Sequence, residues 1–257
     1  MLNLRTAITG SLLVPALLVS AVAMADVSDE QNFEFEVNPG AQLRLDNVNG
    51  DISISAWDAN VIAVRAIKTG DDQEELDRIN IVVDATEDAV TIDTKHGSGK
   101  GSWFNWSSDG KGSVEYIVQA PRDLVLRAIE TVNGDIRIED VEGRVNAETV
   151  NGDIETSGLA GPTELETVNG GIEADFDSFA AGQSAEFETV NGRIRVYLPR
   201  DISANISAGS VNGSIKNDFG LTEKTGIASH SLDGVVGDGD GELKFDTVNG
   251  SIQIRAK

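Results

Sequence analysis

Short runs in which apolar and polar residues alternate recur every nine residues between positions 126 and 175. Each run opens with an apolar residue, followed by a variable residue and a glycine. The opening residues are Val132, Val141, Val150, Leu159 and Val168. Beyond the glycine, positions such as Ile136 and Ile138 are apolar with a polar residue between them, and a period of two is typical of a β-strand. The pattern predicts short strands with a corner at each glycine, and an opening apolar residue that is buried.

These units could build two architectures. A meander of hairpins would need longer and more even strands, although Asn-Gly is a strong hairpin signal. A β-solenoid fits the short strands better, because two units make a coil and stacked coils bury one continuous core. We therefore predict an all-β, single-domain β-solenoid, a parallel β-helix with about 18–22 residues per coil.

The tripeptide Val-Asn-Gly occurs seven times and, in the regular region, alternates with units that carry Glu or Ala in place of Asn. Its Asn and Gly residues are Asn49 and Gly50, Asn133 and Gly134, Asn151 and Gly152, Asn169 and Gly170, Asn191 and Gly192, Asn212 and Gly213, and Asn249 and Gly250. We expect them at one edge of the solenoid, with each glycine in a left-handed or otherwise restricted conformation. The amides of Asn133, Asn151, Asn169, Asn191 and Asn212 should then bond from coil to coil as a structural ladder.

The region before residue 126 is less regular. Alternation predicts strands near residues 33–37, 43–45, 61–66, 79–84, 90–94 and 114–119, and the acidic stretch 70–78 predicts a turn or a short helix. Because no linker separates the two regions, we treat 26–257 as one domain. Towards the other end, Leu232-Asp233-Gly234 resembles a degenerate corner, and the strand 251–255 is expected at an exposed terminal edge.

Residues 1–25 have the features of a secretory signal peptide. Arg5 precedes an apolar stretch over 7–22, and Ala23-Met24-Ala25 matches a small-residue cleavage site. We predict that the mature chain is exported to the periplasm or the cell surface, and that it has no transmembrane segment. The chain contains no cysteine, so neither disulfide bonds nor lipid attachment to a cysteine can contribute.

The chain is strongly acidic, with 43 Asp and Glu against 20 Lys and Arg and a formal net charge of −23. Such a charge repels nucleic acids and anionic lipids at long range. Nucleic acid is therefore excluded as a partner.

The pattern resembles the bacterial putative-adhesin family, an envelope-associated β-solenoid family of unknown function. The resemblance rests on Leu43 to Ile54 with Trp57-Asp58, on Val114 to Pro121, on the Glu-Thr-Val-Asn-Gly repeats and on Val196 to Pro199. It covers nearly the whole mature chain, implies a right-handed solenoid, and carries no catalytic residues.

A row of carboxylates is the first candidate site. Alternation along the strands places Glu130, Glu148, Glu166 and Glu188 outward on successive coils about 4.8 Å apart. Like charges at this spacing repel by roughly 1 kcal/mol per pair in water and attract divalent cations, so weak calcium binding is one hypothesis. The alternative is a solvated face whose charge is relieved by Arg127, Arg137 and Arg144.

Two other possible calcium motifs lack the residues that calcium binding requires. The position after Asn-Gly is Asp in three copies but Gly171, Arg193, Ser214 or Ser251 in the others, and a metal stack cannot contain Arg. The segment Asp238-Gly-Asp240-Gly-Glu242 lacks the full EF-hand spacing and is expected to be an acidic turn. No cofactor is otherwise predicted.

The second candidate site is the Gly/Ser-rich segment 97–113, which contains Trp103, Phe104 and Trp106. Aromatic residues on such a loop could bind a sugar, a protein or a bilayer interface. The alternative is that they fold back and plug an open end of the solenoid.

Catalytic motifs are poor. The two histidines, His96 and His230, lie in no zinc or triad pattern, and carboxylate pairs are uninformative in so acidic a chain. We predict a non-enzymatic exported scaffold that acts in adhesion or in protein or glycan interaction at the bacterial envelope. The alternatives are a carbohydrate-active enzyme on a β-helix and an accessory protein of envelope-stress signalling.

Overall fold

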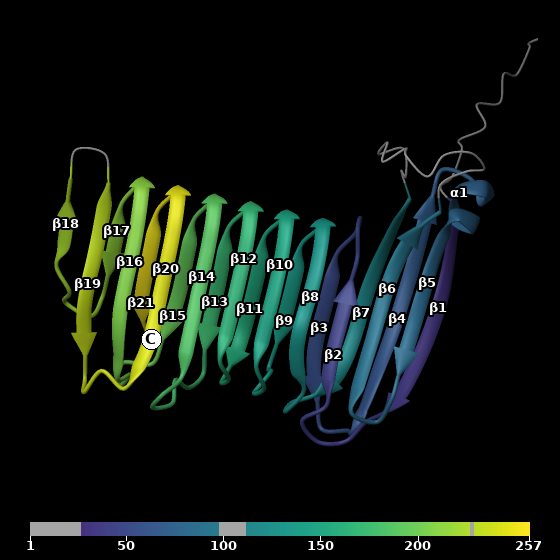
Figure 1. The fold of residues 1–257 in the computed structure, drawn as a ribbon, viewed down its shortest axis with the longest axis horizontal. Coiled ribbons are helices and arrows are strands. Elements are labelled where there is room, and N and C mark those ends of the chain that lie inside the picture. Colours follow the sequence, from purple (N-terminus) through teal and green to yellow (C-terminus); the bar gives the residue numbers. More distant parts are fainter. Residues whose placement is uncertain (1–26, 98–111, 227–228) are drawn as a thin grey trace, which may run out of the picture.

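The chain forms two long β-sheets that share one apolar core (Figure 1). The structure is a computed structural model and describes residues 27–97, 112–226 and 229–257. In spatial order, the first sheet contains β1 (Val27–Glu36), β4 (Val61–Gly70), β7 (Ser113–Pro121), β3 (Ile52–Trp57), β9 (Ile136–Glu139), β11 (Ile154–Leu159), β13 (Ile172–Phe176), β15 (Ile194–Leu198), β21 (Ile252–Ala256) and β17 (Ile215–Asn217). The second contains β18 (Glu223–Thr225), β19 (His230–Val236), β16 (Ala204–Asn212), β20 (Gly241–Asn249), β14 (Ser184–Asn191), β12 (Thr163–Asn169), β10 (Val145–Asn151), β8 (Val125–Asn133), β2 (Gln42–Asp46), β6 (Ala89–His96) and β5 (Ile79–Ala85).

Each regular coil has one strand in each sheet. The chain runs along a strand of the second sheet, turns at Asn-Gly and enters a strand of the first, as β12 leads through Gly170 into β13. Neighbouring coils pair in parallel and in register, so that Leu165 of β12 lies beside Ala147 and Phe187. Inward positions such as Leu165 and Ile172 are almost completely buried. The prediction of an all-β, single-domain, solenoid-like fold is therefore confirmed, whereas the handedness of the coil stays a prediction.

The coils do not stack in the order of the sequence. Strand β14 pairs with β20 rather than with β16, and β20 pairs on its other side with β16. In Figure 1 the yellow β20 accordingly stands between the green β14 and β16. The coil made by β20 and β21 is thus inserted between two coils that precede it in the chain. Inside the core, the rings of Phe187 and Phe245 stack at 5.1 Å between centroids, which fits this pairing.

Two expectations for this region are wrong. Leu232-Asp233-Gly234 is not a corner, because it lies within β19, which runs antiparallel to β16 and continues the second sheet beyond the last coil. The strand 251–255 is not at an edge either, because β21 pairs with β15 on one side and β17 on the other. Both errors come from assuming that coils follow one another in sequence order.

The region before residue 126 extends both sheets at the other end. Strands β2 and β3 form a regular coil that stands next to β8 and β9, and β6 and β7 pair with them in parallel. Beyond these, β4, β1 and β5 add antiparallel strands. The acidic stretch forms α1 (Gln73–Arg78) rather than only a turn, because the Asp72 side chain accepts a hydrogen bond of 2.8 Å from the Glu75 backbone N–H and caps the helix.

Candidate functional site

The seven Val-Asn-Gly corners align along one edge of the solenoid, and their asparagines form one continuous column. In spatial order the Asn column is Asn49, Asn133, Asn151, Asn169, Asn191, Asn249 and Asn212. From Asn133 onward, each Nδ2 donates to the Oδ1 of the preceding asparagine in the column at 2.8–2.9 Å, whereas the Nδ2 of Asn49 donates to the Gly112 carbonyl oxygen at 3.3 Å. The predicted ladder is confirmed, with one correction: Asn249 stands between Asn191 and Asn212.

The corner glycines are required because the backbones of neighbouring coils approach closely. A Cβ on Gly170 would lie closer than 3.0 Å to the carbonyl group of Gly152, and the same overlap recurs at every Val-Asn-Gly corner. Among the seven, only Gly50 has a positive φ, of 115°. Of the two expected alternatives, the left-handed conformation holds for Gly50 alone; at the other six corners it is the lack of a side chain that matters.

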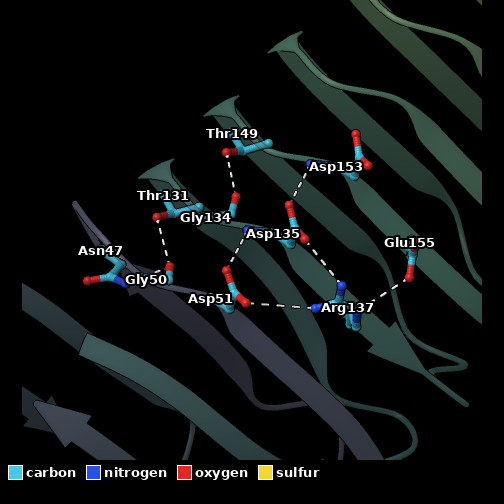
Figure 2. A network of polar contacts seen from close by, with 10 residues as sticks. All are labelled: Asn47, Gly50, Asp51, Thr131, Gly134, Asp135, Arg137, Thr149, Asp153 and Glu155. Carbon is cyan, nitrogen blue, oxygen red and sulfur yellow. Dashed lines mark hydrogen bonds and ion pairs between the residues drawn. The ribbon is translucent and has the colours of Figure 1, made fainter. Parts of the chain in front are cut away.

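Two further polar columns join the coils beside the corner (Figure 2). The Oγ1 of Thr149 donates to the carbonyl oxygen of Gly134 at 3.0 Å, and equivalent Thr or Ser hydroxyls do so along the edge. The carboxylate of Asp135 accepts the backbone N–H of Asp153 at 2.9 Å. The polar side chains of the repeat are thus used between coils, and each Asp that follows Asn-Gly accepts a backbone N–H of the next coil.

The outward carboxylates also align, as predicted. Glu130, Glu148, Glu166 and Glu188 occupy equivalent positions on neighbouring strands, and Asp46 and Asp246 extend the row at its ends. We call these six residues the Glu column.

Cations lie at both ends of the Glu column but not at its middle. Arg44 is 2.9 Å from Asp46 and 3.8 Å from Glu130. Lys244 contacts Glu186 and lies 2.8 Å from Glu188 and 3.4 Å from Asp246. Within the described ranges, no Lys or Arg forms an ion pair with Glu148 or Glu166.

The pKa values of two neighbours in the Glu column shift in opposite directions because of this arrangement. Partial burial, together with repulsion from Glu188 and Glu148, raises the pKa of Glu166. The hydrogen bond from Lys244 lowers the pKa of Glu188. The predicted relief by Arg127, Arg137 and Arg144 is wrong. Arg137 instead contacts Asp135 and Glu155 (Figure 2), Arg127 bonds to Gln42, and Arg144 forms no ion pair with a described residue of the Glu column.

The valines of Val-Asn-Gly face outward, contrary to the expectation that each opening apolar residue is buried. Val48, Val132, Val168, Val190, Val211 and Val248 are 36–47% exposed, and only Val150 is less so. At the other corner of the coil, Val141 and Leu159 are fully buried, as predicted. We call the seven valines of the repeat the Val column. It runs beside the Glu column, because six of the valines lie two residues after an acidic residue of that column; Val211 instead follows Gly209.

Four members of each column line a shallow groove of about 520 Å³ on the second sheet: Glu148, Glu166, Glu188 and Asp246, and Val168, Val190, Val248 and Val211. The groove extends from β10 across β12, β14, β20 and β16 to β19, where Ser229, His230 and Ser231 close it. The Glu column ends at Asp246, because the equivalent position on β16 is Gly209, which has no side chain and also lines the groove. Sequence reasoning missed this groove, although the alternation that placed Glu166 outward also places Val168 outward.

A family model described as Toastrack DUF4097 matches residues 41–255. The chain belongs to the Toastrack DUF4097 family. No curated protein matches this Toastrack chain.

One solved structure shares the fold at low sequence identity. A putative cell adhesion protein from Clostridium sporogenes ATCC 15579 is 17% identical with a TM-score of 0.51, and the match covers 89% of this Toastrack chain and all of that chain. A putative adhesin from Bacteroides fragilis NCTC 9343 is 12% identical with a TM-score of 0.42, covering 88% and 97% of the two chains. At 17% identity the likeness to the Clostridium sporogenes protein supports the fold alone.

The arrangement of the described acidic and histidine side chains does not support a metal site in this Toastrack chain. In the part of the chain that the structure describes, no group of three or more Asp, Glu or His side chains is arranged to hold a metal ion. Asp238 to Asp240 form the turn between β19 and β20, with Gly237 and Gly239 at positive φ, as expected for an acidic turn. Weak calcium binding by the Glu column stays a prediction, and a calorimetric titration without heat at millimolar calcium would remove it.

Several predicted features lie outside the described residues or remain separate from the groove. Trp103, Phe104, Trp106 and the signal peptide fall in segments that the structure does not describe. His96 lies on β6, far along the second sheet from His230 of β19, so the two histidines are not brought together. No helix among the described residues is both long and apolar enough to cross a bilayer.

Proposed function

We propose that this chain is a non-enzymatic interaction scaffold of the bacterial envelope, acting in adhesion or in binding a protein or glycan. The observation that carries the proposal is that the polar and apolar side chains of the repeat have different environments. Its Asn, Thr and Asp side chains bond to neighbouring coils, whereas its valines are exposed in a column along the molecule. An apolar column of this length on a surface is typical of an interaction site.

The envelope setting is supported by two independent features. The first 25 residues have the charge, apolar stretch and cleavage site of a signal peptide. The solved structure from Clostridium sporogenes that shares the fold is described as a putative cell adhesion protein. Cell fractionation followed by N-terminal sequencing tests this part: we expect an envelope fraction and a first residue of Asp26, and a cytoplasmic protein that retains Met1 would contradict it.

A substrate screen tests the non-enzymatic part. The purified chain 26–257 would be incubated with a panel of bacterial and plant polysaccharides, and a glycan array would be probed in parallel. We expect either specific binding or no interaction, but no new reducing ends and no unsaturated products. Turnover of any polysaccharide would overturn the scaffold proposal in favour of a carbohydrate-active enzyme.

The aromatic segment can be tested separately. Replacing Trp103, Phe104 and Trp106 by Ala should lower the melting temperature if these residues plug an end of the solenoid. Unchanged melting with loss of glycan or protein binding would instead assign them to the interaction surface.

A further inference from the structure

We propose that the groove between the Glu and Val columns binds a cationic amphipathic α-helix of a partner protein or peptide. The inference rests on the scaffold function and names the chemistry of its partner. Three features carry it: the exposed valines, the uncompensated carboxylates beside them, and the axial repeat of the coils.

The Val column requires an apolar partner surface. Val168, Val190, Val248 and Val211 stand on four neighbouring strands, and each is 39–47% exposed. All four line the groove. Covering a contiguous row of methyl groups is favourable in proportion to the apolar area removed from water. Isolated exposed valines would need no explanation, but a continuous row does.

The Glu column requires a partner with positive charge. Glu148 and Glu166 line the same groove and form no ion pair within the described residues, whereas Glu188 is already held by Lys244. A Lys or Arg from a partner would meet two carboxylates on neighbouring coils. The same charges disfavour a nucleic acid, an anionic lipid surface, or a second copy of this face, because each would bring like charges together.

The spacing of the coils favours a helix over an extended chain. Neighbouring strands lie about 4.8 Å apart. Apolar residues three and four positions apart on an α-helix advance by about 4.5 and 6 Å along its axis, so a helical stripe keeps close step with the valines over several turns. Side chains on one face of an extended chain repeat at about 6.8 Å and lose register after two coils. The five intervals from β10 to β19 span about 24 Å, which a helix of about 16 residues would fill.

A defined peptide tests the proposal directly. The probe is a fluorescent 18-residue helix with Leu at i, i+3, i+4 and i+7 and Lys along one flank of that stripe. One control has the same composition in scrambled order, and the other has Glu in place of each Lys. Fluorescence anisotropy with the purified chain 26–257 should show saturable binding of the probe only, weaker at 300 mM than at 50 mM salt because its ionic contacts are screened.

Variants on both columns locate the site. The double variant Glu148→Gln/Glu166→Gln and the double variant Val168→Ser/Val190→Ser should each weaken binding by about tenfold or more. Two matched controls should not: Glu242→Gln removes an exposed carboxylate of β20 outside the groove, and Val235→Ser changes a 57% exposed valine of β19 that does not line it. Circular dichroism melts would confirm that every variant folds.

Three outcomes would overturn the inference: no binding of the probe, equal binding of the scrambled peptide, or equal loss in the groove and control variants. None of these would refute the broader scaffold proposal, which fails only if the chain turns over a polysaccharide or proves to be cytoplasmic.

Discussion

Two adjacent glycines, Gly170 and Gly171, should respond very differently to substitution by alanine. Gly170 is a corner residue whose Cβ would overlap the Gly152 carbonyl group, closer than 3.0 Å. A Cβ on Gly171 would instead lie 3.3 Å from the carbonyl oxygen of Arg193 and 3.7 Å from Asp153. The position of Gly171 holds Asp or Arg in other coils, so a side chain is accommodated there.

The structure gives a magnitude for the first substitution. Relieving the overlap at Gly170 requires a shift of about 1 Å or more between the coils. Three hydrogen bonds meet at this point: Gly170 N–H to the Asn191 carbonyl at 3.1 Å, Thr167 Oγ1 to the Gly152 carbonyl at 3.0 Å, and Gly171 N–H to Asp153 at 2.6 Å. At about 1 kcal/mol each, their loss lowers the free energy of unfolding by about 3 kcal/mol.

Thermal melts followed by circular dichroism provide the measurement. A loss of about 3 kcal/mol corresponds to a fall in melting temperature of about 6–12 °C for a domain of this size. Gly171→Ala should stay within about 1 kcal/mol of the wild type, because the reduced entropy of the unfolded chain offsets a small adjustment at Arg193. The reasoning fails if Gly170→Ala melts within about 3 °C of the wild type, or if both variants lose the same stability.

Two more pairs of variants test the polar columns by urea denaturation. Glu166→Gln should stabilise the fold by about 1 kcal/mol near pH 7, because it removes repulsion from two neighbouring carboxylates. Since the pKa of Glu166 is raised in the folded state, this gain should be present above that pKa and vanish as the pH falls below the ordinary value of 4.5. Glu188→Gln should instead lower the free energy of unfolding near pH 7, because the hydrogen bond from Lys244 lowers the pKa of Glu188. A change of stability in the same direction for both variants would contradict this account. Asn169→Ala removes a donated and an accepted hydrogen bond and should cost about 1–3 kcal/mol, whereas Asn212→Ala removes one and should cost about half, so equal losses would argue against additive bonding along the Asn column.

The solenoid and its Asn column could be predicted because both depend on local repeats. The nine-residue spacing sets the strands and corners, and Asn recurs at one corner only. The same alternation that turned Glu166 outward also determined the exposure of Val168, so the Val column was within reach of the sequence. It was missed because a recurring apolar residue was equated with a buried one.

The order of the coils could not be read from the repeat. Every Val-Asn-Gly corner presents an asparagine amide and a glycine carbonyl, so these two groups do not select one neighbouring coil over another. What distinguishes neighbours lies in the core, such as Phe187 stacked on Phe245, and side-chain fit across 58 residues of sequence leaves no periodic signal. The groove depends on this order too, because it crosses β20 before β16.

The inserted coil also makes the assembly order of the molecule differ from its order of synthesis. Residues 204–236, which form β16, β17, β18 and β19, leave the ribosome before residues 241–256, yet the later segment lies beneath them and joins them to β14 and β15. Until residues 241–256 are added, β16 and β17 lack the strands that join them to the preceding coils, because they pair with β20 and β21. A simple solenoid can grow coil by coil from one end. Here β20 and β21 have to insert between β14 and β15 on one side and β16 and β17 on the other. We therefore expect the last step of folding to form both sets of strand pairs cooperatively.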